Sequence, residues 1–223
     1  MEITTDTILN AYAQGYFPMA AEHDFQKIEW ILPSIRGLLP IKDIHISKSL
    51  LRVLNKKVYR VTVDTAFQKV IDACAVTKEG REQTWINLKI RDWFIELHTQ
   101  GFAHSIEVWK NDELVGGLYG LALGGVFCGE SMFSTATNAS KVALVHLAAI
   151  LHKGGFVLLD AQFPNPHLEQ FGAYEMAHDD YAVALNEALS VQADFYCGSS
   201  AETVSEGSDL LVSEFLQSRS QTS

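Results

Sequence analysis

Apolar residues recur at helical spacing in several stretches of the chain, and most of these stretches carry an end signal. The pattern predicts a helix over 5–14, which Gly15 ends. Asp64 and Asn87 are each expected to cap a helix, the first running to about residue 75 and the second to about residue 100. Asn138 is expected to cap a helix that runs to residue 152 and is apolar on nearly every side, which predicts a buried helix. Shorter helices are expected over 47–55, 166–171 and 179–189.

Other stretches alternate between apolar and polar positions, which is typical of strands. Residues 104–109 alternate in this way, Asn111-Asp112 supplies a tight turn, and 113–123 returns as the second arm of an antiparallel hairpin. Further strands are expected over 59–63, 126–129 and 156–159, the last of which delivers Asp160 at its end. Tyr16-Phe17-Pro18 is expected to form an aromatic turn, because proline cannot continue the preceding helix.

This order of elements predicts an α+β fold with a mainly antiparallel sheet. We expect a small N-terminal domain over 1–62 and a larger domain over 63–196. Residues 197–223 are rich in serine and acidic side chains and only weakly periodic, which predicts a disordered or loosely attached tail. A chain of 223 residues with 48% hydrophobic content is long enough to bury a core of this kind.

Composition narrows the functional classes. The N-terminus lacks the charged-then-apolar pattern of a secretion signal. The longest uncharged run, 114–129, is rich in glycine and shorter than the ~20 apolar residues that span a bilayer. We therefore expect a cytoplasmic protein without a membrane partner. Its three cysteines are odd in number and do not have the spacing of metal ligands, so neither a disulfide framework nor a metal site is predicted.

The net charge of −10 would ordinarily argue against binding to nucleic acid, but the charge is unevenly distributed. The segment from residue 42 to residue 60 contains six basic residues and one acidic residue, Asp43. Such a segment is either a solvated helix face, which charge alone favours, or a local surface for phosphates. The residues concerned are Lys42, Lys48, Arg52, Lys56, Lys57 and Arg60.

Two carboxylates interrupt apolar segments, Glu130 after 126–129 and Asp160 after 156–159. A buried carboxylate needs a partner or hydrogen bonds, so each either ties a loop to the sheet or takes part in chemistry. Both are expected at strand ends beside small residues, where a substrate can approach closely. The sequence therefore predicts a cleft at this edge of the sheet.

Several motifs together carry a specific resemblance. In this order and combination, over roughly residues 8–185, they closely resemble the leucyl/phenylalanyl-tRNA-protein transferase family. The motifs are Tyr12-Ala-Gln-Gly15-Tyr16-Phe17-Pro18-Met19, Trp30 with Pro33 and Arg36-Gly37, His45-Ile-Ser47-Lys48-Ser49, Thr84-Trp85-Ile86, Gly101-Phe-Ala-His104-Ser105-Ile-Glu107, Leu114-Val-Gly116-Gly117-Leu-Tyr119-Gly120, Phe127-Cys-Gly129-Glu130-Ser131-Met132-Phe133-Ser134, Asn138-Ala-Ser140-Lys141 and Asp160-Ala-Gln162.

The resemblance implies a small N-terminal domain followed by a domain of the acyl-CoA N-acyltransferase (GNAT-like) type. It also implies transfer of Leu, Phe or, less well, Met from aminoacyl-tRNA to proteins that begin with Arg or Lys, which marks them for the N-degron pathway. No metal and no diffusible cofactor are expected. The protein is expected to act as a monomer.

The resemblance also assigns roles to residues. Asp160 is expected to hydrogen-bond the attacking amine and help to remove its proton, and Gln162 to orient the reacting groups or steady charge on the carbonyl oxygen. Leu118, Phe127, Met132 and Leu159 would form the pocket for the aminoacyl side chain, with Glu130 and Ser131 beside it. Trp30 and Trp85 would stack on the terminal adenosine. Acceptor-stem phosphates would meet Lys48, Arg52, Lys56, Lys57 and Arg60.

Two other functions compete with this one. An acetyl-CoA-dependent N-acetyltransferase would need a Gln/Arg-x-x-Gly-x-Gly/Ala turn to grip the pyrophosphate, and the sequence has no such segment. A noncatalytic tRNA-binding protein would bind charged tRNA without forming a peptide product, and Glu130 and Asp160 would then be dispensable.

Overall fold

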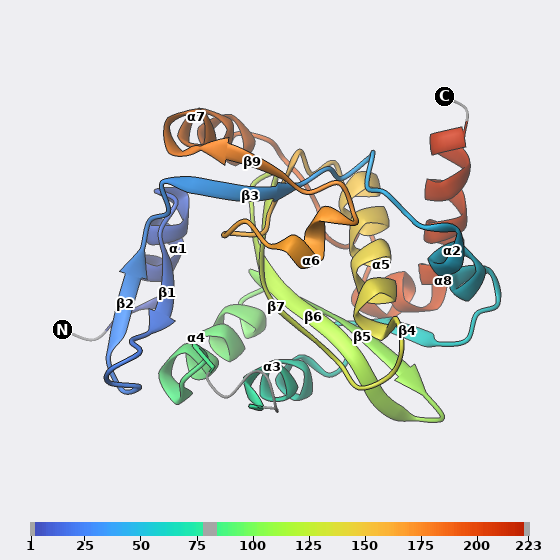
Figure 1. The fold of residues 1–223 in the computed structure, drawn as a ribbon, viewed down its shortest axis with the longest axis horizontal. Helices are drawn as coiled ribbons and strands as arrows, with labels where there is room; N and C mark the ends of the chain where they lie inside the picture. Colours follow the sequence, from blue (N-terminus) through green and yellow to red (C-terminus); the bar gives the residue numbers. More distant parts are fainter. Residues whose placement is uncertain (1–2, 78–83, 221–223) are drawn as a thin grey trace.

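A seven-stranded mixed sheet forms the centre of the computed structural model, which describes residues 3–77 and 84–220 (Figure 1). Neighbouring strands are antiparallel, except that β7 and β8 run parallel. The expected α+β class with a mainly antiparallel sheet is therefore confirmed. In spatial order the strands are β4 (Arg60–Val63), β5 (Ala103–Lys110), β6 (Glu113–Leu123), β7 (Val126–Ser134), β8 (Leu158–Asp160), β3 (Ile35–Leu39) and β9 (Tyr174–Ala177).

The predicted hairpin is formed by β5 and β6, which pair along the whole of β5. β5 and β6 are joined through Asn111 and Asp112, whose φ angles of 50° and 61° give the left-handed geometry of a tight hairpin turn. Consecutive residues of a strand point to opposite faces, and Leu118 and Tyr119 of β6 accordingly belong to two different core clusters. The sheet is thus buried on both sides.

Helices cover the two faces. On one face lies the predicted buried helix, α5 (Ala139–Lys153), with α2 (Lys48–Asn55) beside it. The other face is covered by α3 (Phe67–Ala75), α4 (Leu88–Thr99), α1 (Thr5–Ala13) and α7 (His178–Leu189). Asn87 caps α4 as expected, because its side chain accepts a hydrogen bond from the backbone N–H of Ile90 at 2.9 Å.

One capping expectation is wrong, and another is confirmed only in position. Asp64 does not cap α3, whose N-cap is Ala66. Its φ of 57° turns the chain, and its carboxylate accepts hydrogen bonds from the backbone N–H of Ser105 and the hydroxyl of Tyr196 and contacts His104, so Asp64 ties β4 to β5 in the interior. Asn138 is the N-cap residue of α5, at a φ of 68°, but its side chain makes no capping hydrogen bond.

The N-terminal part differs from expectation as well. Residues 17–20, expected to begin in a turn, form strand β1 (Phe17–Ala20), which pairs with β2 (Ile28–Ile31) in a separate two-stranded sheet. β3 follows directly and joins the large sheet between β8 and β9. The expected domain boundary near residue 62 therefore coincides with no break in the large sheet.

The C-terminal segment is helical rather than disordered, which corrects the expectation for 197–223. Helix α8 spans Ala201–Ser220 and packs against β4 and α5 (Figure 1). Val204, Val212 and Phe215 are buried there, eight and three residues apart, which is the spacing of one helix face. The intervening serines and acids weaken the apolar pattern along the sequence, and residues 221–223 lie outside the described part of the chain.

No helix in residues 3–77 and 84–220 is both long and apolar enough to cross a membrane. Cys74 and Cys128 are buried, and Cys197 is partly exposed.

Candidate active site

A cavity of about 360 Å³ opens where β7 and β8 separate. The two strands pair only up to Cys128 and Asp160. Beyond that point 129–132 lines one side of the cavity and Asp160 and Ala161 line the other, with α5 behind. The predicted cleft beside Asp160 is therefore present, although Glu130 lies within β7 and not at its end.

A β-bulge presents Glu130 to this cavity. Tyr119 of β6 pairs with Ser131 and Gly120 pairs with Gly129, so Glu130 is the extra residue in β7. A Cβ atom on Gly120 would lie 2.4 Å from the carbonyl oxygen of Cys128, so only glycine permits this close approach of the two strands. The bulge explains how a carboxylate can stand in an otherwise apolar strand.

The carboxylate of Glu130 is buried, and only one of its two oxygens has a hydrogen-bond partner among the described residues. Its Oε1 accepts hydrogen bonds from the hydroxyl of Tyr12 at 2.7 Å and from Nε2 of Gln162 at 2.9 Å. Its Oε2 is buried without a hydrogen-bond partner among the described residues. Burial raises the pKa of Glu130 to about 8, although the two hydrogen bonds oppose the shift. Glu130 therefore changes protonation state near neutral pH.

Asp160 is engaged on both of its oxygens. Arg36, which is 1% exposed, binds it from β3 through Nε and Nη2 at 2.6 to 3.0 Å. The hydroxyl of Tyr181 and the backbone N–H of Gln162 each donate to it at 2.7 Å. Arg36 is fixed in turn by a hydrogen bond to the carbonyl oxygen of Gly15 and by the ring of Tyr181. Direct contact of Asp160 with an attacking amine would have to displace one of these donors.

Gln162 connects the two carboxylates. Its backbone N–H binds Asp160 and its side-chain amide binds Glu130, while its φ of 67° gives it a left-handed backbone. Gly37 supports this turn, because a Cβ atom there would lie 2.4 Å from the carbonyl oxygen of Phe163. Gln162 is buried next to the cavity and is not one of its lining residues. Nε2 of Gln162 points to Glu130, so the amide oxygen is the end of the side chain that Glu130 does not engage.

The predicted substrate residues divide into two groups. Phe127 is fully buried and stacks on Phe195 at 5.7 Å between ring centroids, and Trp30 stacks on Trp93 at 6.3 Å; neither lines this cavity. Trp85 does line it and also borders a neighbouring hollow of about 480 Å³. The predicted residues that the cavity brings together are Trp85, Leu118, Glu130, Ser131, Met132, Leu159 and Asp160.

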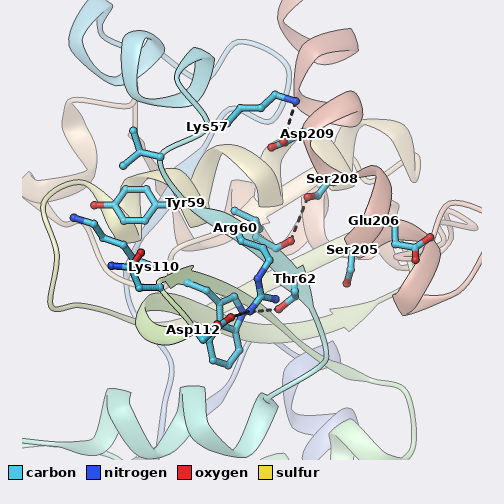
Figure 2. Close-up of a pocket in the computed structure, with 14 residues that line it drawn as sticks. Lys57, Tyr59, Arg60, Thr62, Lys110, Asp112, Ser205, Glu206, Ser208 and Asp209 are labelled. Carbon is cyan, nitrogen blue, oxygen red and sulfur yellow. Dashed lines mark hydrogen bonds and ion pairs between the residues drawn. The ribbon is translucent and has the colours of Figure 1, made fainter.

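The basic side chains of the predicted RNA surface are all exposed. Lys48 and Arg52 lie on α2, and Lys56 follows it. Lys57 and Arg60 lie further along, in a separate groove between β4 and α8, which Figure 2 shows. None of the five lines the cavity beside Asp160.

Sequence reasoning gave no role to Arg36, Tyr12 or Tyr181, which hold the two carboxylates. Arg36 did carry a signal, since a charged residue inside the apolar stretch 35–39 requires a buried partner. That partner lies 124 residues away in the sequence, so the pattern alone could not identify it.

Among the residues that the structure describes, no group of three or more His, Cys, Asp or Glu side chains is arranged to hold a metal ion.

Comparison with known proteins gives consistent matches. The family model described as leucyl/phenylalanyl-tRNA protein transferase matches residues 38–186, and the model for its N-terminal domain matches residues 1–34. Proteins named leucyl/phenylalanyl-tRNA–protein transferase from Rhodospirillum rubrum and Hyphomonas neptunium are 51% and 52% identical to this chain. Each alignment covers 87% of this chain, with 92% of the first relative and 75% of the second.

Among solved structures, the chain is similar to a GCN5-related N-acetyltransferase-like protein from Streptococcus suis. It is 14% identical, with a TM-score of 0.30, and the match covers 85% of this chain and 64% of that chain. A superposition this loose carries no argument about function.

Proposed function

Because this chain belongs to the leucyl/phenylalanyl-tRNA-protein transferase family, we propose that it moves Leu, Phe or, less readily, Met from aminoacyl-tRNA to the N-terminal α-amine of another protein. The acceptors are proteins that begin with Arg or Lys, and the modification marks them for degradation through the N-degron pathway. The enzyme acts in the cytoplasm as a monomer. One observation carries the proposal: an apolar cavity opens directly beside the Glu130, Asp160 and Gln162 cluster.

The apolar half of the cavity suits a large aminoacyl side chain. Leu118, Leu159 and Met132 supply aliphatic and thioether surface, and methionine adapts to both branched and aromatic groups. An apolar pocket separates side chains that differ by one methylene by only ~1–3 kcal/mol. Selection among Leu, Phe and Met is accordingly loose.

The polar half of the cavity suits aminolysis of an ester. The attacking nitrogen forms an amide bond with the ester carbonyl carbon, the ester bond to the ribose breaks, and the released ribose oxygen takes a proton. An acceptor α-amine has an ordinary pKa of roughly 7.7–8.0, so a neutral fraction is present at physiological pH. Much of the rate can then come from holding the amine and the ester together.

The three polar residues have separate roles in this scheme. The amide oxygen of Gln162 accepts a hydrogen bond from the attacking amine and holds its lone pair toward the ester. Glu130 fixes the side chain of Gln162, and Asp160 fixes its backbone. Asp160 thus acts through Gln162, as a positioning residue, because its own oxygens are already occupied.

The tRNA is held outside the cavity. The indole of Trp85 stands between the cavity and the neighbouring hollow, where a stacked terminal adenosine would leave its ester at the cavity mouth. Lys48, Arg52, Lys56, Lys57 and Arg60 meet the acceptor-stem phosphates, which are recognised by backbone shape rather than base sequence. Trp30, which stacks on Trp93, and Phe127, which is buried in the core, make no substrate contact in this scheme.

Incubation with labelled Phe-tRNA and three peptides that begin with Arg, Lys or Ala tests the proposal. The Arg and Lys peptides should each gain one phenylalanyl residue, and the Ala peptide should gain none. Binding of Phe-tRNA without any peptide product would favour a noncatalytic tRNA-binding protein. Acetylation of a peptide from acetyl-CoA would favour an acetyltransferase.

A further inference from the structure

A second hollow lies away from the reaction site, between β4, the β5–β6 turn and α8 (Figure 2). It has a volume of about 650 Å³ and combines both signs of charge. Its basic side chains are Lys57, Arg60 and Lys110. Its acidic side chains are Asp112 in the turn and Glu206 and Asp209 on α8.

Two basic side chains of this groove are paired with carboxylates of the protein itself. Lys57 Nζ lies 3.1 Å from Oδ2 of Asp209, and Arg60 Nη2 lies 3.3 Å from Oδ1 of Asp112. The partners in the Lys57 pair are 64% and 43% exposed. Ion pairs this exposed contribute little to folding, so Lys57 can exchange its partner for another anion.

Asp209, the acidic partner of Lys57, is held in place by helix α8. Next to Asp209, the buried side chain of Ser208 donates a hydrogen bond to the carbonyl oxygen of Val61, and Ser205 binds both backbone groups of Val63. Val212 anchors the following turn in the core. α8 is therefore fixed along the free edge of β4, and Asp209 stays beside the groove while the long side chain of Lys57 can move.

We propose that Asp209 is an internal counter-ion that weakens RNA binding at this groove. It holds Lys57 until an RNA phosphate displaces it, and it remains beside that phosphate as a repelling charge. The inference rests on the proposed function, in which Lys57 and Arg60 meet the acceptor stem. It adds a determinant of RNA affinity outside the region matched by the family model, because α8 begins after residue 186.

The physical consequence concerns discrimination among polyanions. Each phosphate that a basic side chain neutralises releases counter-ions, which makes binding steeply dependent on salt. A fixed carboxylate removes one such contact from any RNA that relies on charge alone. An RNA that is also held by its 3′ end in the cavity loses the same factor in affinity, but from a higher starting affinity, so it stays bound at concentrations at which an RNA held by charge alone is released.

The test measures binding of deacylated tRNA to the full chain across a salt series. Asp209→Asn should tighten binding roughly two- to fivefold at low salt and steepen the plot of log affinity against log salt by about one. The matched control is Glu214→Gln, which removes one charge from the same helix but pairs with Lys153 at 3.6 Å, outside the groove. It should change affinity by less than half as much.

Two further variants identify the partner. In a Lys57→Ala background, Asp209→Asn should lose most of its effect. An Asp209→Asn protein that binds no more tightly than the wild type, or that gains no more than Glu214→Gln, overturns the inference. So does an undiminished gain in the Lys57→Ala background. If instead Lys57→Ala itself binds tRNA like the wild type, the RNA surface in the proposed function is wrong at this position, which is a distinct failure.

Discussion

The side-chain amide of Gln162 donates a 2.9 Å hydrogen bond to Oε1 of Glu130, and both side chains are buried. The partners come from β7 and from the turn after β8, two segments that separate at the cavity. This one contact fixes which end of the amide can meet a substrate. The orientation of Gln162 is thus set before any ligand arrives, as an enzyme that works by positioning requires.

Loss of Asp160 should affect both stability and transfer. Asp160→Asn leaves the guanidinium of Arg36 buried without its counter-charge, which should lower the free energy of unfolding by about 3–5 kcal/mol. Urea unfolding measures this change. The double variant Arg36→Gln with Asp160→Asn should regain much of the stability but not the transfer rate. Equal loss of transfer and of aminoacyl-tRNA binding in the folded Asp160→Asn protein would contradict a role in the reaction.

The pocket wall should control which amino acid is transferred. Leu118→Phe adds a ring to the cavity wall, so transfer of Phe should fall relative to transfer of Leu by roughly tenfold, within the 1–3 kcal/mol that such pockets discriminate. Competition between Leu-tRNA and Phe-tRNA for one acceptor peptide measures the ratio. Phe127→Leu is the control, because Phe127 is buried outside the cavity and its variant should leave the ratio unchanged.

Glu130 should make stability depend on pH. Burial raises its pKa in the folded state to about 8, above the ordinary glutamate pKa of 4.5, so the folded state favours the protonated carboxyl. The resulting stabilisation is fully present below pH 4.5 and is lost as the pH rises through 8. Between pH 5 and 9 the wild type should therefore lose roughly 1–4 kcal/mol relative to Glu130→Gln. If the free energy of unfolding depends on pH in the same way in the wild type and in Glu130→Gln, Glu130 does not titrate in this range.

The basic stretch after α2 should bind RNA through charge. Replacing Lys56 and Lys57 together with Glu should weaken tRNA binding and flatten its dependence on salt, because fewer phosphates are neutralised. The charge-preserving double change to Arg should leave both quantities near their wild-type values. Filter binding at several salt concentrations measures the difference, and unchanged binding in the Glu variant would remove this segment from the interface.

Local signals in the sequence predicted the elements with strong end markers. Asn87 caps α4, Asn111-Asp112 turns the hairpin, and 138–152 forms the buried α5, because each depends on residues close together in the chain. The extension of β7 beyond 129 could not be foreseen, since Glu130 in a bulge breaks the alternation. Helix α8 was missed because its buried face is narrow and its other residues are polar.

In the candidate site, too, local motifs could be predicted from the sequence and long-range contacts could not. Asp160, Gln162 and Glu130 could be nominated from their motifs, and the structure joins them through hydrogen bonds. The residues that bind these carboxylates could not be predicted from the sequence. Arg36 is 124 residues from Asp160, and Tyr12 is 118 residues from Glu130. Long-range pairing of this kind depends on the sheet order, which periodicity does not specify.

Peptide-bond formation is expected to depend on the amide of Gln162, which lies beside the cavity and binds Glu130. The most direct measurement is the single-turnover rate of product formation from Phe-tRNA and an Arg peptide, with enzyme in excess, for the wild type and Gln162→Ala. We predict that the rate falls by about 10²–10³ while the affinity for Phe-tRNA changes less than about threefold. A Gln162→Ala protein that forms product at the wild-type rate would contradict the account.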